Sequence, residues 1–225
     1  MVGPLWFVGF DSLMELVAFA IALAIAYQAF KGYTMTRQRT LFYVQFSFAL
    51  LSAGLLIDSL AGFLGILARA LRATMALTRV GYTLYFFAQL LAYGVLIYAY
   101  VYQAKSVSTT SASLALIPVF GLAALQEPSV PEMKLLGLLV EYHPGSEIIL
   151  LFLLACIAIL TGLNYSATKD RNAFLVFLGF LLLAFSHLLF ILTPLNALMF
   201  VIGHLLQLLG FISLLTMLLR VTTAK

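Results

Sequence analysis

The chain has 225 residues, of which 64% are hydrophobic and only 9% are charged. A water-soluble domain usually has roughly 25% charged residues, so this composition excludes a soluble fold and predicts an integral membrane protein. The net charge of +4 does not indicate nucleic-acid binding, because the basic residues stand at the ends of apolar runs and form no patch. Cys156 is the single cysteine, which excludes a disulfide within the chain.

The apolar runs predict seven membrane-spanning helices in one all-α domain, residues 1–225. All but the fourth reach the roughly 20 residues that a helix needs to cross a bilayer, and the fourth also contains Pro118. Arg69 and Arg72 lie in a segment with the pattern of an interfacial helix. The predicted spans are 5–30, 40–60, 79–103, 114–126, 144–165, 171–192 and, after a turn at 193–196, a last helix that ends at residue 220.

The basic residues predict the orientation, because cytoplasmic loops are richer in lysine and arginine. With the N-terminus outside, the outer loops hold Arg69, Arg72, Arg79 and Lys134. We therefore expect a multi-pass protein of the cell membrane with an external N-terminus and a cytoplasmic C-terminus. The inner loops and tail then hold the larger share of the basic residues, namely Lys31, Arg37, Arg39, Lys105, Lys169, Arg171, Arg220 and Lys225.

A weak internal repeat accompanies these spans. Several residues recur at a spacing of 132, and the segments AQLLAYG around Gln89 and LQLLGFI around Gln207 are similar. We expect two parallel repeats, 5–105 and 133–225, joined by a connector helix at about 110–126 in a 3+1+3 arrangement. Chance matching of apolar segments is the alternative. The matched pairs are Glu15 and Glu147, Thr36 and Thr168, Arg39 and Arg171, and Phe42 and Phe174.

Short landmarks along the chain resemble the microbial rhodopsin (archaeal opsin) family. The resemblance covers most of the chain and implies an opsin-like bundle of seven helices. The three-helix repeat also resembles sugar transporters of the SWEET type, although the Pro-Gln pairs of that family are absent. The opsin-like landmarks are Lys31-Gly32, Phe42-Tyr43, Arg79 at the start of the third helix, Arg171-Asn172, Pro194-Leu195-Asn196, Gly210-Phe211 and Leu218 to Arg220.

The departures from the opsin pattern concern the groups that carry its chemistry. In that family a lysine of the seventh helix binds retinal, and the matching position here is Leu208. A neighbouring aspartate corresponds to His204, and the carboxylates of the third helix correspond to Tyr82 and Tyr93, whose phenols keep their protons at neutral pH. The resemblance therefore implies a scaffold without covalent retinal. All lysines lie in loops or at helix ends: Lys31, Lys105, Lys134, Lys169 and Lys225.

The polar residues within the apolar helices are the candidates for a functional site, because polar groups in a membrane are costly. His187 and His204 both lie roughly 9 to 12 Å inside the outer ends of neighbouring antiparallel helices. We expect a ligand site between helices three, six and seven, and a structural ion pair between Asp58 and Arg79. The predicted ligand-binding residues are Tyr82, Tyr93, His187, His204 and Gln207.

Several functions fit this pattern. The first is a non-enzymatic receptor, sensor or accessory membrane subunit that binds a small apolar ligand or a partner membrane protein. A second is an electron carrier in which His187 and His204 are axial ligands of haem b. A third is a transporter of small solutes. A zinc hydrolase, in which His143, Glu147 or Asp58 joins His187 and His204, is a further alternative. The plainest alternative is that each imidazole only bonds a neighbouring group inside the bundle.

Overall fold

The computed structural model describes residues 5–67, 74–105, 132–135, 138–141 and 144–223. This part of the chain forms six helices and one short hairpin. The helices coincide with the apolar runs, since every backbone N–H and C=O group in a bilayer has to bond within its own segment. The elements are α1 (Leu5–Thr36), α2 (Arg39–Leu67), α3 (Thr74–Lys105), β1 (Glu132–Leu135), β2 (Leu138–Glu141), α5 (Pro144–Thr168), α6 (Arg171–Ile191) and α7 (Ala197–Thr223).

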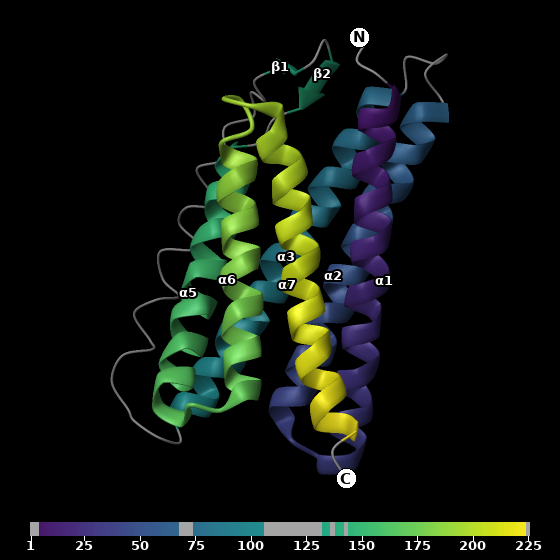
Figure 1. Ribbon diagram of the computed structural model, residues 1–225. Helices are drawn as coiled ribbons and strands as arrows, with labels where there is room; N and C mark the ends of the chain where they lie inside the picture. The colour runs from purple at the N-terminus through teal and green to yellow at the C-terminus, as the bar shows by residue number, and fades with distance from the viewer. Residues whose placement is uncertain (1–4, 68–73, 106–131, 136–137, 142–143, 224–225) are drawn as a thin grey trace.

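The six described helices form a closed ring (Figure 1). Each helix contacts the next in the order α1, α2, α3, α5, α6 and α7, and α7 then packs against α1. Contacts within α1–α3 and within α5–α7 are more extensive than the contacts of α3 with α5 and of α1 with α7. We call α1–α3 the first half and α5–α7 the second half. The α3–α5 and α1–α7 contacts are the two joints between them.

The helices alternate in direction, which gives the ring two distinct ends. Helices α1, α3, α5 and α7 begin at the upper end in Figure 1, where the N-terminus also lies. We call this the N-terminal end and the opposite one the C-terminal end. Which of them faces the outside of the cell stays a prediction from the distribution of basic residues.

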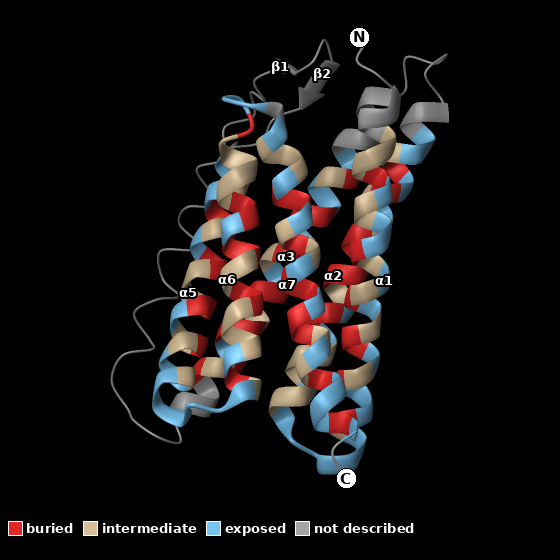
Figure 2. Ribbon diagram, in the orientation of Figure 1, coloured by how far each residue is buried: buried red, intermediate tan, exposed pale blue. Residues whose placement is uncertain are grey.

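Buried and exposed residues alternate along the helices (Figure 2), and large apolar residues are found in both classes. Phe48, Tyr93 and Phe211 are buried in the interior core. Ile159 and Leu163, by contrast, are 63% and 64% exposed. Such an apolar exterior is expected for a surface in contact with lipid, and all six helices are long and apolar enough to cross a membrane. The protein is therefore a polytopic membrane protein.

Glycines bring helices close together within each half. In the second half, a Cβ atom added at Gly210 of α7 would lie 2.9 Å from the backbone oxygen of Gly179 in α6. In the first half, a Cβ atom at Gly54 of α2 would lie 2.8 Å from the Cβ of Ala88 in α3. Small residues at such points let two helix backbones pack closely in a membrane.

Two short turns join the helices at the C-terminal end. Arg37 in the α1–α2 turn has a φ of 56°, and Lys169 in the α5–α6 turn has a φ of 54°. The N–H of Arg37 donates to the carbonyl of Tyr33, and the N–H of Lys169 donates to that of Tyr165, both at 2.8 Å. Both turns thus end their first helix with a left-handed residue whose N–H satisfies a carbonyl of the last helical turn.

The prediction of seven spanning helices is wrong, because the structure describes six helices that are long and apolar enough to span. The fourth predicted span, 114–126, lies outside the described residues, as does the segment with Arg69 and Arg72. Thirteen residues would extend only about 20 Å as an α-helix, short of the roughly 30 Å of a hydrocarbon core. The antiparallel β1–β2 hairpin, which pairs Glu132 with Glu141, was not expected either.

Candidate functional site

Ionisable and hydroxyl side chains from all six helices gather toward the N-terminal end of the ring. We call this set the polar layer. It extends no deeper than the third turn of α7, and below it the interior is apolar around Phe48, Phe180 and Phe211. The polar layer consists of Asp11 and Glu15 on α1, Asp58 on α2, Tyr82 on α3, Ser146 and Glu147 on α5, His187 on α6, and His204 and Gln207 on α7.

Glu147, in the first turn of α5, connects three helices. Its Oε2 atom is 2.6 Å from Nδ1 of His187, and its Oε1 atom accepts a 3.3 Å hydrogen bond from the hydroxyl of Tyr82. The Tyr82 hydroxyl is also 2.5 Å from Oγ of Ser146. The side chains of Glu147 and His187 are only 14% and 3% exposed. These four residues, the Glu147 cluster, therefore meet at the α3–α5 joint almost out of contact with solvent.

The contact with Glu147 sets the tautomer of the His187 ring. A carboxylate only accepts hydrogen bonds, so we assign a proton to Nδ1, and in the neutral ring the lone pair is then on Nε2. Nε2 is buried and has no hydrogen-bond partner within the described residues. A buried polar atom without a partner costs about 1 to 3 kcal/mol. This nitrogen is therefore a place where a hydrogen-bond donor would be stabilising.

His204 connects α7 to α1 at the other joint. Its Nδ1 atom is 3.0 Å from the backbone oxygen of Phe200, and its Nε2 atom is 3.0 Å from Oδ1 of Asp11. A carbonyl oxygen only accepts, so Nδ1 carries a proton. The bond between Nε2 and the Asp11 carboxyl then needs a second proton, carried either by Nε2 or by the carboxyl group. The α1–α7 joint is thus closed by a contact that holds a bound proton.

Glu15 and Asp58 form a second contact that needs a proton. Their side chains lie within hydrogen-bonding reach of each other between α1 and α2. Two ionised carboxylates cannot bond to each other, so this contact forms when one of the two groups holds a proton. Asp58 was expected to pair with Arg79, whose side chain lies outside the described residues. That pair stays a prediction, and the partner that the structure gives Asp58 is Glu15.

The other predicted site residues are spread along the ring interior. Gln207 donates a 3.3 Å hydrogen bond from Nε2 to the hydroxyl of Tyr85, which connects α7 to α3. Tyr93 lies three helical turns further from the N-terminal end than Tyr82, within the apolar core, and is 1% exposed. The structure therefore brings Tyr82 and His187 together through Glu147. It places Gln207 beside Tyr85 and separates Tyr93 from the polar layer.

The two histidines flank one aromatic ring. The ring centroid of Phe190 is 5.7 Å from that of His187 and 4.9 Å from that of His204. Both ring nitrogens of His204 have partners, whereas His187 has one free nitrogen, so an axial haem role stays a prediction. Within the described part of the chain, no group of three or more His, Cys, Asp or Glu side chains could hold a metal ion. His143, proposed for a zinc site, lies outside that part.

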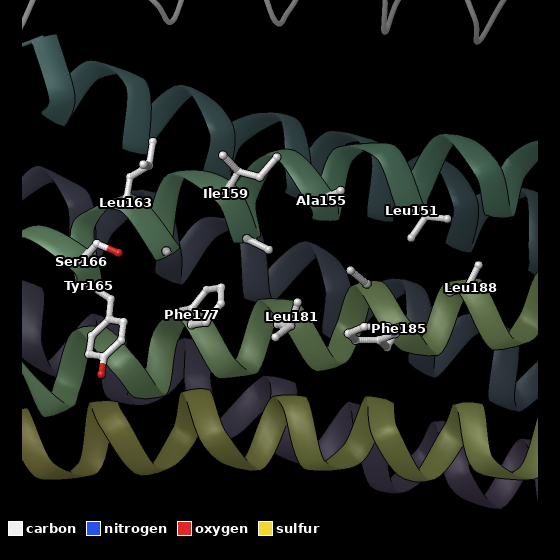
Figure 3. A pocket seen from close by; sticks show the side chains of 13 residues that line it. Leu151, Ala155, Ile159, Leu163, Tyr165, Ser166, Phe177, Leu181, Phe185 and Leu188 are labelled. Carbon is white, nitrogen blue, oxygen red and sulfur yellow. The ribbon is translucent and has the colours of Figure 1, made fainter. Parts of the chain in front are cut away.

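An apolar groove runs along the outside of α5 and α6 (Figure 3). Its volume is about 560 Å³, and Leu151, Ile159, Phe177 and Phe185 are among its lining residues. Its polar groups are those of Tyr165 and Ser166, at the C-terminal end of α5. The groove is thus mainly apolar and contributes no residue of the polar layer.

Sequence reasoning missed Glu147 and Asp11 as partners of the histidines, because both acids were interpreted as solvated at the membrane boundary. The depth of each residue along its helix is the sequence feature that could have indicated these partners. Glu147 lies three residues after the start of α5 and His187 four before the end of α6, so both are roughly 5 to 6 Å deep. Asp11 and His204 lie six and seven residues after the starts of α1 and α7, roughly 9 to 10 Å deep. Equal depth on adjacent helices indicates both pairs.

Comparison with protein-family models, with curated proteins and with solved structures finds no match to this chain. The resemblance to microbial rhodopsins therefore stays a prediction, and the function has to be argued from the polar layer itself.

Proposed function

We propose that this protein is a membrane transporter that exchanges protons for small monovalent cations. The observation that carries the proposal is the position of the proton-dependent contacts. Asp11 and His204 close the α1–α7 joint through a bound proton, and the Glu147 cluster spans the α3–α5 joint. Both joints between the halves are thus held at the N-terminal end by ionisable groups.

A contact at the opposite end of the α1–α7 joint is uncharged. There the hydroxyl of Thr222 donates a 3.3 Å hydrogen bond to Oε1 of Gln28. Loss of a proton from the Asp11–His204 contact would remove its hydrogen bond and leave the Gln28–Thr222 contact unchanged. Proton release therefore loosens the joint at one end only, which is the asymmetry that alternating access to a site requires.

The charges of the polar layer favour a cation. Asp11, Glu15, Asp58 and Glu147 supply four carboxyl groups, against which the predicted Asp58–Arg79 pair would set one positive charge. A cation that enters between Glu15 and Asp58 can replace the shared proton. One positive charge then leaves as another enters, so the exchange needs no buried charge to be left uncompensated.

Similarity between the halves supports a transport function. The α1–α2 and α5–α6 turns share their hydrogen bonds and positive φ angles at a spacing of 132 residues. Glu15 and Glu147 stand at the same spacing. Many transporters consist of two structural repeats that move against each other around a site at their interface. Under this proposal the halves are such repeats, and the joints are where they move.

The test is counterflow in proteoliposomes loaded with unlabelled sodium, potassium or methylammonium. We expect the unlabelled cation inside to stimulate uptake of the labelled cation. In vesicles that contain no such cation, net uptake should instead be accompanied by release of protons from the vesicle. Asp58→Asn, which removes an ionisable group but keeps its shape, should reduce this uptake at least tenfold. Gly94→Ala serves as the matched control, because a Cβ atom at Gly94 meets nothing within 4 Å.

Absence of stimulated uptake for all three cations, in protein that remains folded, would overturn the proposal. Binding of a ligand without flux would instead favour the receptor, sensor or accessory-subunit function. An absorption spectrum of the purified protein separates the haem alternative, which predicts a Soret band that disappears when His187 or His204 is replaced.

A further inference from the structure

We propose that the cation is one that donates N–H hydrogen bonds, ammonium or a primary alkylammonium, and that Nε2 of His187 is its acceptor. This inference rests on the proposed cation exchange, names the class of cation, and adds a second contact point in the polar layer to the one between Glu15 and Asp58. Among the ring nitrogens of His187 and His204, Nε2 of His187 is the one without a hydrogen-bond partner among the described residues.

The surroundings of His187 fix this nitrogen as an acceptor. The Glu147 carboxylate accepts from Nδ1–H, and Tyr82 donates to the same carboxylate, so the ring cannot turn over without losing that contact. His187 is only 2% exposed, so water does not replace the missing partner at the surface. Nε2 therefore presents a fixed lone pair to whatever enters the ring interior beside it.

A lone pair on nitrogen distinguishes between kinds of monovalent cation. Hard metal cations in proteins are held mainly by oxygen atoms, whereas an ammonium group binds through directed N–H donors that suit either nitrogen or oxygen acceptors. The Glu147 carboxylate contacts Nδ1 on the other side of the same ring, so it balances the positive charge without contacting the cation. The site thus offers a nitrogen acceptor and a countercharge.

An aromatic ring beside the acceptor supports the same class of ligand. Phe190 stands almost perpendicular to the His187 ring, at an interplanar angle of 89°, and also contacts His204. Aromatic faces attract organic cations, which are less strongly hydrated than small metal ions. The charged groups that face this point are Glu147 from α5 and the Asp11–His204 contact from α1 and α7, with the Tyr82 hydroxyl from α3.

The experiment measures the thermal unfolding midpoint of purified protein in methylammonium, tetramethylammonium and potassium chloride at equal concentrations. A ligand that binds the folded state raises the midpoint as its concentration rises. We expect methylammonium to stabilise the protein and the other two salts to have no specific effect, because neither donates N–H bonds.

Two substitutions separate the roles of the two imidazole nitrogens of His187. In His187→Asn the amide N–H replaces Nδ1–H toward Glu147 but no acceptor remains at Nε2, so the response to methylammonium should weaken at least tenfold. In His187→Gln the longer amide places an acceptor near the position of Nε2, so part of the response should return. Gly94→Ala should respond like the unmodified chain.

The outcomes distinguish this inference from the transport proposal. Equal stabilisation by tetramethylammonium, or an unchanged response in His187→Asn, would overturn the inference. Counterflow of potassium or sodium without any effect of methylammonium would also overturn it, while cation exchange would stand. If none of these cations binds or shows counterflow, both the inference and the transport proposal are overturned.

Discussion

The α1–α2 and α5–α6 turns are built in the same way, 132 residues apart along the chain. The ring centroids of Tyr33 and Phe42 are 5.6 Å apart in the first turn, and those of Tyr165 and Phe174 are 5.3 Å apart in the second. In both turns the basic residue with positive φ lies over the tyrosine ring, at 5.9 Å and at 5.5 Å. The two turns therefore share a backbone conformation, an aromatic pair and a cation–π contact.

The same helices differ in chemistry at their N-terminal end. Glu15 on α1 and Glu147 on α5 stand at the same spacing of 132, yet Glu15 bonds the carboxyl of Asp58 and Glu147 bonds the imidazole of His187. The first pair needs a shared proton, whereas the second joins an acid to a base. The halves thus match where their helices are connected and differ where ionisable groups meet, which locates the functional asymmetry in the polar layer.

The largest expected effect tests the packing on which each half depends. Gly210→Leu would drive a side chain into the backbone of Gly179, which cannot move aside as a side chain can. We expect a loss of about 3 kcal/mol in the free energy of unfolding, measured by denaturant titration in detergent. Gly94→Ala is the control and should change it by less than about 1 kcal/mol. A Gly210→Leu protein as stable as the control would show that the α6–α7 approach is not tight.

A second prediction sharpens the contrast between the two glutamates. Glu147→Gln weakens a charged acceptor that faces both Nδ1–H of His187 and the Tyr82 hydroxyl, so we expect a loss of about 2 kcal/mol. Glu15→Gln supplies an amide N–H to Asp58 without a shared proton, so the change should be below about 1 kcal/mol. Denaturant titrations of both variants measure the difference. Equal losses would mean that the two contacts are alike.

The smallest effect concerns the one clear difference between the turns. Asp170 caps α6, accepting from the N–H groups of Asn172 and Ala173 through Oδ2, while Gln38 holds the equivalent place before α2. Asp170→Ala should cost about 1 kcal/mol, and Gln38→Asp should add about 0.5 kcal/mol by capping α2. The same titrations apply. No gain from Gln38→Asp would show that the turns differ in more than this side chain.

Sequence alone predicted most of the helix positions. Pro144 and Arg171 were placed correctly as the starts of α5 and α6, because a proline and an aspartate next to an apolar run are strong start signals. The end of α1 was placed six residues too early, at Phe30, since the polar residues that follow were taken for a turn. The helix continues to Thr36, where long and hydroxyl-bearing side chains sit at the membrane boundary.

The partners of the buried polar groups were not predictable to the same degree. The cost of polar groups in lipid indicates that His187 and His204 lie inside the bundle, but it does not give the order of the helices around the ring. That order puts α5 beside α6 and α1 beside α7, and so gives each histidine its carboxylate. Contacts between helices far apart in sequence depend on the whole packing and on no local pattern.

The closed ring has a consequence for how the protein assembles during synthesis. α1 leaves the ribosome first of the six described helices, yet its second neighbour, α7, is made last. Until α7 arrives, Asp11 has no histidine to bond, and one side of α1 faces lipid. The membrane insertion machinery therefore has to tolerate an unfinished bundle until α7 has been made, and the Asp11–His204 contact is the last of these joints to form.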